Sequence, residues 1–228
     1  MVIISLFISA IFVSFAMIEQ SRMRNLFKNI EIYETSIQLF KNKYFGLPGD
    51  IPNAEDFWGS VATNNGNGDE EILYNTATGN NESLRAWQQL SFAGFLEGNY
   101  TGQTDGTGQL ATPGVNVPVI NFQQEIGAFV NSSITWLGEG RNNLLILGTE
   151  RAGTGTFSNG AFLTIEQASV IDQKIDDGLP GQGKILAADG DWDGTVAVTT
   201  DCINGTDIAA FYENNDDVIG CIIAVQLY

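Results

Sequence analysis

Val2–Tyr44 reads VIISLFISAIFVSFAMIEQSRMRNLFKNIEIYETSIQLFKNKY and contains neither glycine nor proline. Its first part, Val2–Ile18, carries no charge and is apolar almost throughout, which is typical of a helix at the lower length limit for crossing a bilayer. After it, apolar residues recur every three or four positions, on one face of a helix. We therefore predict one unbroken helix, roughly 60 Å long, with a membrane half and an amphipathic half. The apolar stripe of the amphipathic half consists of Met23, Leu26, Ile30, Tyr33, Ile37, Phe40 and Tyr44.

The rest of the chain is strongly acidic. The 228 residues include 10 lysines and arginines against 27 aspartates and glutamates, a net charge of −17. Residues 1–43 carry a net charge of +2 and residues 44–228 a net charge of −19. Such an acidic body repels phosphate backbones, so no nucleic-acid partner is expected. The chain has no histidine, which excludes Ser-His-Asp and Cys-His catalysis and histidine-based zinc or haem sites.

Cys202 and Cys221 are the two cysteines of the chain. Two thiolates do not complete a structural zinc site, which needs four ligands. We therefore predict a disulfide and an oxidising compartment, with two buried free thiols as the alternative.

The basic residues Arg22, Arg24 and Lys28 follow the apolar segment. Taken alone, the positive-inside rule would leave the body in the cytoplasm, which conflicts with a disulfide. A cleaved signal peptide is not indicated, because no basic region precedes the apolar run and no small-residue cleavage site follows it.

Local patterns predict two short helices early in the body. Leu47–Asp50 (LPGD) ends the long helix, because proline disfavours helical backbone before it and glycine permits a turn. Asn53 is expected to cap a short helix that carries Phe57 and Trp58 into the core. Ser83 is expected to cap a helix at Leu84–Glu97 that ends at Gly98 and contributes the core residues Leu84, Trp87, Leu90 and Phe95.

The second half of the body is predicted to be mostly strands. Thr164–Gln167 forms a capping box, which predicts a helix from there to Asp176. Short apolar runs between glycine- and asparagine-rich turns predict strands at ITWLG, NLLILG, GAFLTI, GTVAVTT and VIGCIIAVQLY. A long helix with one antiparallel sheet and short inserted helices is an α+β fold.

Four stretches, in order along most of the chain, match the pattern of a known superfamily. They are KNKYFGLPGDIPNAEDFW (Lys41–Trp58), ESLRAWQQLSFAGFLEGNYTG (Glu82–Gly102), TPGVNVP (Thr112–Pro118) and LTIEQASVIDQKIDDGLPGQGKI (Leu163–Ile185). Following a long N-terminal helix, they resemble the type IV pilin and type II secretion pseudopilin superfamily. The resemblance is greatest to prepilin-like proteins with a KYxxLPGDxPNA signature.

The resemblance implies a pilin-like fold, with residues 1–45 as the transmembrane and assembly helix and residues 46–228 as the extracytoplasmic globular domain. It implies a structural subunit of the bacterial inner membrane. Such a subunit assembles with other pilin or pseudopilin subunits, through its N-terminal helix, into a type IV pilus or a type II secretion pseudopilus.

The chain departs from the family at its N-terminus. Family members begin with a basic leader, a glycine cleavage site, an aromatic residue that becomes the methylated N-terminus, and a nearby glutamate. None of these is present, so we expect the leader, which prepilin peptidase would remove, and the first turns of the helix to precede Met1. A basic leader would also reconcile the charge pattern with an extracytoplasmic body.

One acidic loop is a candidate metal site. Asp189, Asp191 and Asp193 occupy the first half of an EF-hand pattern, D-x-D-x-D-G, in which alternate carboxylates converge on calcium. Thr200 stands where the closing bidentate glutamate belongs, which favours a solvated turn without metal. A second loop, Asn64–Glu71, is rich in asparagine, glycine and acids and is a further candidate metal site.

No other chemistry stands out in the chain. It contains no nucleophile elbow, no phosphate-binding loop and no dinucleotide fingerprint, so no enzymatic activity and no cofactor other than calcium are expected. The alternative to a structural subunit is an extracytoplasmic binding module, held by a signal anchor, that recognises a ligand through calcium or exposed aromatic rings. An upstream basic leader ending in glycine would favour the subunit.

Overall fold

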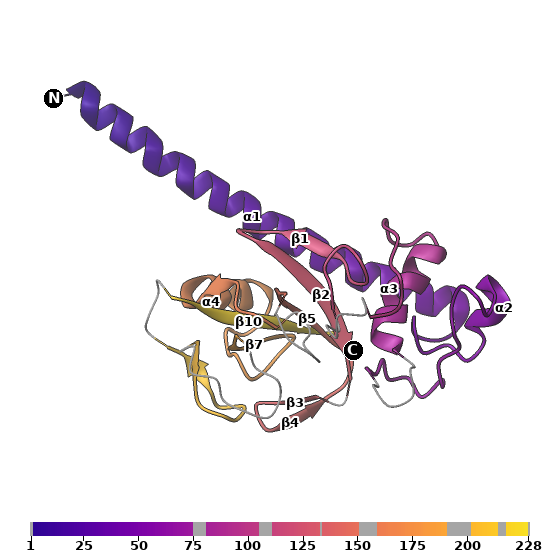
Figure 1. The fold of residues 1–228 in the computed structure, drawn as a ribbon. Coiled ribbons are helices and arrows are strands. Elements are labelled where there is room, and N and C mark those ends of the chain that lie inside the picture. Colours follow the sequence, from indigo (N-terminus) through magenta and orange to yellow (C-terminus); the bar gives the residue numbers. More distant parts are fainter. Residues whose placement is uncertain are drawn as a thin grey trace.

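The computed structural model describes residues 2–74, 81–104, 111–132, 134–150, 159–190, 202–213 and 218–227, with no side chains described for residues 2–13, 15, 16, 135 and 136. The fold is α+β, as predicted: a long N-terminal helix, α1 (Val2–Tyr44), lies along a C-terminal antiparallel sheet and short helices. The N-terminal half of α1 projects away from the body (Figure 1).

The main sheet is antiparallel and has the order β1-β2-β5-β10-β6, with β7 also paired to β10. The strand β10 is central, because β5 pairs with one of its edges while β6 and β7 share the other. The strands are β1 (Val119–Asn121), β2 (Glu125–Asn131), β5 (Leu144–Thr149), β6 (Leu163–Thr164), β7 (Ile185–Asp189) and β10 (Ile219–Gln226).

Apolar side chains cover both faces of this sheet, which explains why NLLILG is a continuous apolar run rather than an alternating one. One face packs against α1 and the helices α3 and α4. The opposite face, which includes Leu144, Ile146 and Ile222, packs against two small hairpins. The hairpins are β3 (Ile134–Trp136) with β4 (Glu139–Arg141), and β8 (Ile203–Asn204) with β9 (Phe211–Tyr212). The strand predicted at GTVAVTT lies outside the described residues.

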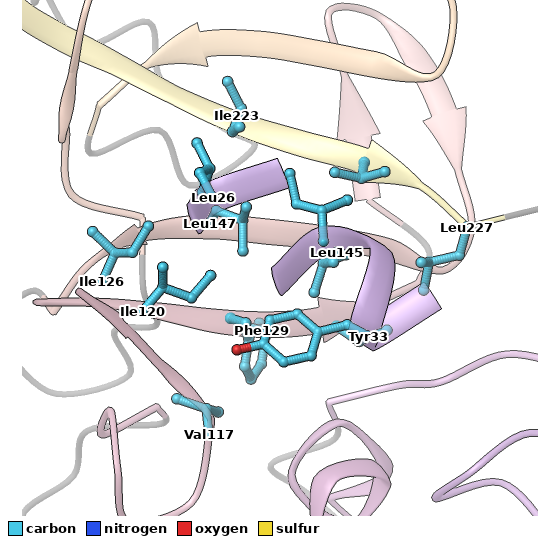
Figure 2. Close-up of a cluster of buried hydrophobic side chains, with 14 of the residues drawn as sticks. Leu26, Tyr33, Val117, Ile120, Ile126, Phe129, Leu145, Leu147, Ile223 and Leu227 are labelled. Atoms are coloured by element: carbon cyan, nitrogen blue, oxygen red, sulfur yellow. The ribbon is translucent and has the colours of Figure 1, made fainter. Parts of the chain in front are cut away.

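The predicted stripe of α1 is confirmed. Its first six members, from Met23 to Phe40, are buried, and Tyr44 is half-buried against the same core. Figure 2 shows Leu26 and Tyr33 among side chains of the sheet, including Phe129 and Leu145. Tyr33 also meets Trp87 of α3 edge-to-face, with ring centroids 5.2 Å apart.

The predicted end of the second short helix is wrong. The helix α3 (Glu82–Phe92) stops five residues before Glu97, because Gly94 adopts a φ of 75°. The Gly94 amide donates to the carbonyl of Ser91 and the Phe95 amide to that of Leu90, a Schellman ending that needs this left-handed glycine. Trp87 and Leu90 are buried as predicted.

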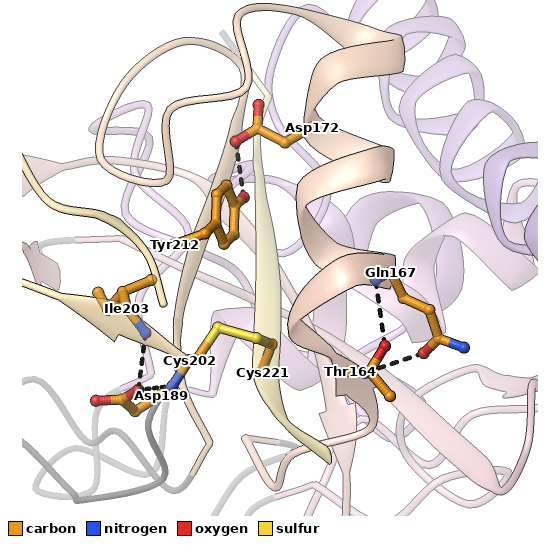
Figure 3. The surroundings of a disulfide bond; sticks show 8 residues. All are labelled: Thr164, Gln167, Asp172, Asp189, Cys202, Ile203, Tyr212 and Cys221. Atoms are coloured by element: carbon orange, nitrogen blue, oxygen red, sulfur yellow. Dashed lines mark hydrogen bonds between the residues drawn. A yellow bond between two sulfur atoms is a disulfide. The ribbon is translucent and has the colours of Figure 1, made fainter. Parts of the chain in front are cut away.

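The predicted helix starts are right in one case and partly wrong in two. The helix α4 (Ile165–Ile175) begins with the expected capping box, in which Thr164 and Gln167 exchange hydrogen bonds (Figure 3). Ser83 lies inside α3, which begins one residue earlier, and its buried hydroxyl makes no cap.

In α2 (Ala54–Trp58), Asn53 holds the cap position but its side chain makes no capping bond. Asn65 replaces it, accepting a hydrogen bond from the Glu55 amide at 2.9 Å. Phe57, predicted to enter the core, is 49 % exposed.

The predicted disulfide is present. Cys202, next to β8, bonds to Cys221 of β10, with Cα atoms 5.1 Å apart, inside the usual range (Figure 3). Both residues are fully buried. The bond ties the β8–β9 hairpin to the central strand of the sheet.

Replacing both Cys202 and Cys221 by alanine is expected to lower the free energy of unfolding by about 3 kcal/mol, because the closed loop restricts the unfolded chain. Urea titration followed by tryptophan fluorescence measures the change. Wild-type protein treated with a reductant should lose a similar amount. Equal midpoints for the wild type and the double variant would contradict the expectation.

Candidate functional site

The most distinctive feature of the molecule is the way α1 leaves the body. Met17 and Ile18 are 67 % and 49 % exposed, whereas Met23 is the first buried side chain among those described in α1. The helix nevertheless continues without interruption from Val2. The segment predicted to span a membrane, Val2–Ile18, is therefore helical, but most of its side chains lie outside the description. Among the described residues, no helix meets the length and apolarity that a membrane crossing requires.

The second half of α1 is fixed to the body mainly by packing, supplemented by a few polar contacts. The side-chain amide of Asn25 donates to the backbone carbonyl of Asn121 in β1 at 3.1 Å. The Ser36 hydroxyl donates to the backbone carbonyl of Phe95 at 2.8 Å. Lys184 forms an ion pair with Glu34 at 2.7 Å, but partly exposed pairs contribute little to stability. The buried stripe therefore supplies most of the docking energy.

The LPGD turn at the end of α1 packs against α3. Gly49 has a φ of 86°, and a Cβ atom there would lie 2.2 Å from the carbonyl oxygen of Glu82, so only glycine fits. Its amide donates to Oε1 of Gln89 at 2.7 Å in the core. The signature motif thus forms the tight contact at which the chain turns back from α1.

Two buried carboxylates organise the loop that follows. Asp50 accepts hydrogen bonds from the amides of Gly68 (2.7 Å) and Glu70 (2.9 Å), and Glu82 accepts one from the Leu73 amide (3.0 Å). The loop Asn64–Glu71, a candidate metal site by its sequence, therefore directs amide donors at these carboxylates. Asp69 accepts from the Glu71 amide in a local turn. The loop Asn64–Glu71 therefore has the geometry of a structural loop.

Burial is the largest cause of the pKa shifts of Asp50 and Glu82. Loss of hydration raises the pKa of Glu82 to about 7, despite the amide hydrogen bonds that favour its charged form. Burial likewise raises the pKa of Asp50.

The candidate calcium ligands are described only in part. Asp189 ends β7, and its Oδ1 accepts hydrogen bonds from the amides of Cys202 (2.7 Å) and Ile203 (3.3 Å), which joins β7 to β8 (Figure 3). Asp191 and Asp193 lie outside the described residues. Calcium binding by Asp189, Asp191 and Asp193 therefore stays a prediction.

A different acidic cluster was missed by the sequence analysis. Asp172, Asp176 and Asp177, at the C-terminal end of α4, present carboxylate oxygens within 4.8 Å of one another. Asp172 accepts from the Tyr212 hydroxyl at 2.7 Å, and Asp176 accepts from the amides of Lys184 and Ile185. The spacing of four residues places Asp172 and Asp176 on the same face of a helix, which was the available sequence signal for the cluster. It does not indicate that Tyr212 of β9 contacts Asp172.

The pKa values of Asp172 and Asp176 shift in opposite directions. Burial, followed by the hydrogen bond with Asp176, raises the pKa of Asp172 to about 7. Burial also acts to raise the pKa of Asp176, but hydrogen bonds from Asp172, Ile185 and Lys184 outweigh it and lower that pKa. The pair thus holds the end of α4 to β7 and β9.

Exposed aromatic rings gather at the other end of α1. Phe45, Phe57 and Phe92 are 94 %, 49 % and 39 % exposed. Trp58 lies between Phe57 and Phe92, with ring centroids 5.6 Å and 6.0 Å away. These rings can offer an apolar contact surface to another molecule.

The described residues thus combine a helix that projects from the body with an exposed cluster of aromatic rings at its other end. Comparison with family models, curated protein sequences and solved structures found no match to this chain.

Proposed function

We propose that this protein is a structural subunit of the pilin or pseudopilin type. Its N-terminal helix anchors it in the bacterial inner membrane, with the body on the extracytoplasmic side. The helix then packs with those of other pilin-like subunits in a type IV pilus or a type II secretion pseudopilus. The observation that carries the proposal is that α1 runs unbroken for 43 residues, while Met23 is the first buried side chain among those that the structure describes in it.

The physical reason is the cost of leaving the first half of α1 in water. Val2–Ile18 bears no charge, and exposed apolar surface costs about 25 cal/mol per Å². Lipid and neighbouring helices are the two environments that remove this cost. A subunit stored in a membrane and assembled through the same helix uses both in turn.

Two further observations support this proposal. The disulfide between Cys202 and Cys221 suits an oxidising, extracytoplasmic compartment. The motif KYxxLPGDxPNA, on which the resemblance depends, coincides with the turn that joins α1 to the body. A role in assembly also requires no catalytic group.

The chain beginning at Met1 is expected to sediment with membranes and to need detergent for release, whereas a chain beginning at Asn25 should remain in the soluble fraction. The shorter chain keeps the buried stripe from Leu26 onward, so its circular dichroism should show a folded body. Fractionation and immunoblotting measure the distribution. If the chain beginning at Met1 stays soluble without detergent, the membrane anchor is refuted.

The exposed rings of Phe45, Phe57 and Phe92 favour a second candidate, a tethered binding module. The two candidates differ in what happens when all three rings are replaced by serine. A binding module should lose its ligand and remain anchored, whereas a subunit that assembles through α1 should still assemble.

A further inference from the structure

The segment Asn64–Tyr74, which we call the strap, contains no helix or strand and is held in place through its backbone amides. Every amide from Asn67 to Tyr74 donates a hydrogen bond to a side-chain oxygen. One set of acceptors consists of Asp50 in the LPGD turn and Glu82 in α3. Another set lies at the ends of β2 and β5 and is uncharged: Asn131, Ser132 and Asn143.

The two carboxylates that hold the strap are buried without a cation. Asp50 and Glu82 are 2 % and 4 % exposed. Among the residues that the structure describes, no lysine or arginine forms a hydrogen bond or an ion pair with either of them. Ionisation of both therefore carries a free-energy cost that contact with water would remove. The amides of the strap offset part of this cost, and they come from Asn67, Gly68, Asp69, Glu70 and Leu73.

The charges that act on Glu82 all oppose its ionisation. Burial is the largest cause that raises its pKa, to about 7, and the charges of Asp50 and Asp69 raise it further. Arg85, on the next turn of α3, has Glu55 of α2 as its charge partner rather than Glu82. The other charged side chains of the strap are acidic as well: Glu70 and Glu71.

The strap also contacts the helix that carries exposed aromatic rings. Asn65 accepts a hydrogen bond from the Glu55 amide at 2.9 Å and so caps α2. This helix has only five residues, so its order depends on contacts of this kind. It carries Phe57 and Trp58, whose ring centroids lie 5.6 Å apart in the aromatic cluster.

We propose that the strap is a pH-dependent device, closed while Glu82 is protonated and released when Glu82 ionises beside Asp50. Release admits water to both carboxylates, so the open strap binds the proton less tightly than the closed strap. Opening therefore becomes easier as pH rises towards 7. Because Asn65 leaves with the strap, α2 and its aromatic rings lose their cap, while the buried stripe of α1 stays docked. This inference does not depend on the proposed function.

Amide hydrogen exchange of the chain beginning at Met1, in dodecyl maltoside micelles, tests the proposal by mass spectrometry. After correction for intrinsic exchange, strap amides should exchange roughly 25-fold faster at about pH 8 than at about pH 5.5. The reason is that the closed strap holds the proton of Glu82 up to about pH 7 and the open strap only up to about pH 4.5. The excess should level off above about pH 7. Amides of α2 should follow the strap, and those of β10 should stay protected.

Glu82→Gln imitates the protonated side chain and should remove the excess. The matched control is Glu70→Gln, an exposed acid of the same strap, which should keep it. Exchange without an excess in the wild type overturns the proposal, as does an excess that survives in Glu82→Gln or disappears in Glu70→Gln. Equal acceleration of the strap and β10 indicates global unfolding and also overturns it. A strap that opens while α2 stays unchanged refutes the link to the aromatic rings. If Glu82→Gln does not fold, the wild-type curve decides, because an excess that levels off below about pH 5 excludes Glu82.

Discussion

Replacing Phe40 by alanine should lower the free energy of unfolding by about 3–5 kcal/mol, which would leave little of the stability of a typical domain. Phe40 is fully buried in the stripe of α1, and its ring lies 4.6 Å from that of Tyr44 and 6.2 Å from that of Trp58. Alanine would remove these contacts and leave a cavity that the rigid helix cannot close. Chemical denaturation of the chain beginning at Asn25 measures the loss.

Leu39 is the matched control for this substitution. It is the preceding residue of α1 and is 46 % exposed on the other face. Leu39→Ala should change the free energy of unfolding by about 0.5 kcal/mol or less, because surface substitutions remove few contacts. Equal losses for Phe40→Ala and Leu39→Ala would show that α1 is not docked through its stripe.

The protein should be most stable in mildly acidic solution, because Glu82 and Asp172 both have a pKa near 7 in the folded state. The unfolded chain releases these protons near pH 4, so the folded state binds more protons between about pH 4 and pH 7. The stability due to this proton binding is complete below the unfolded pKa and is lost as pH rises through 7. The free energy of unfolding should fall by about 2 kcal/mol per group between about pH 5.5 and pH 8, measured by urea titration.

Asp172→Asn isolates one of the two groups. Asparagine stays uncharged at every pH and has nearly the same shape as the protonated carboxyl group. The variant should therefore lose about half of the pH dependence and should match or exceed the wild type at high pH. Glu139→Gln, on an exposed strand, should follow the wild-type curve. Parallel curves for Asp172→Asn and the wild type would contradict the raised pKa of Asp172.

Elements defined by residues close together in the sequence were predicted well. The stripe of α1 follows from a spacing of three and four residues, and the capping box at Thr164 from a spacing of three. The strand β5 and the central strand β10 were recognised from short apolar runs. In each case the residues that make the pattern are also those that make the local contacts.

Other elements were missed or misplaced because their sequence signals are weaker. β1, β2 and β7 were not predicted, and α3 was extended past its end. Gly94 was the relevant stop signal, but glycine inside an apolar helical pattern also occurs without ending a helix. Phe57 is apolar and follows a helix start, yet its side chain stays 49 % exposed although its ring lies 4.9 Å from that of Tyr44 in α1.

The sequence by itself determined the long helix, its division into an uncharged and an amphipathic half, the α+β class and the pairing of the two cysteines. These depend on composition and on periodicity, which the chain carries without reference to its fold. The tertiary structure decided which acids are buried together and which surfaces remain open. Asp50 meets Gly68 and Glu70, Asp172 meets Tyr212, and α4 borders a groove along α1 only after distant segments have packed. The raised pKa values and the groove arise from that packing, because desolvation and shape depend on neighbours in space rather than in sequence.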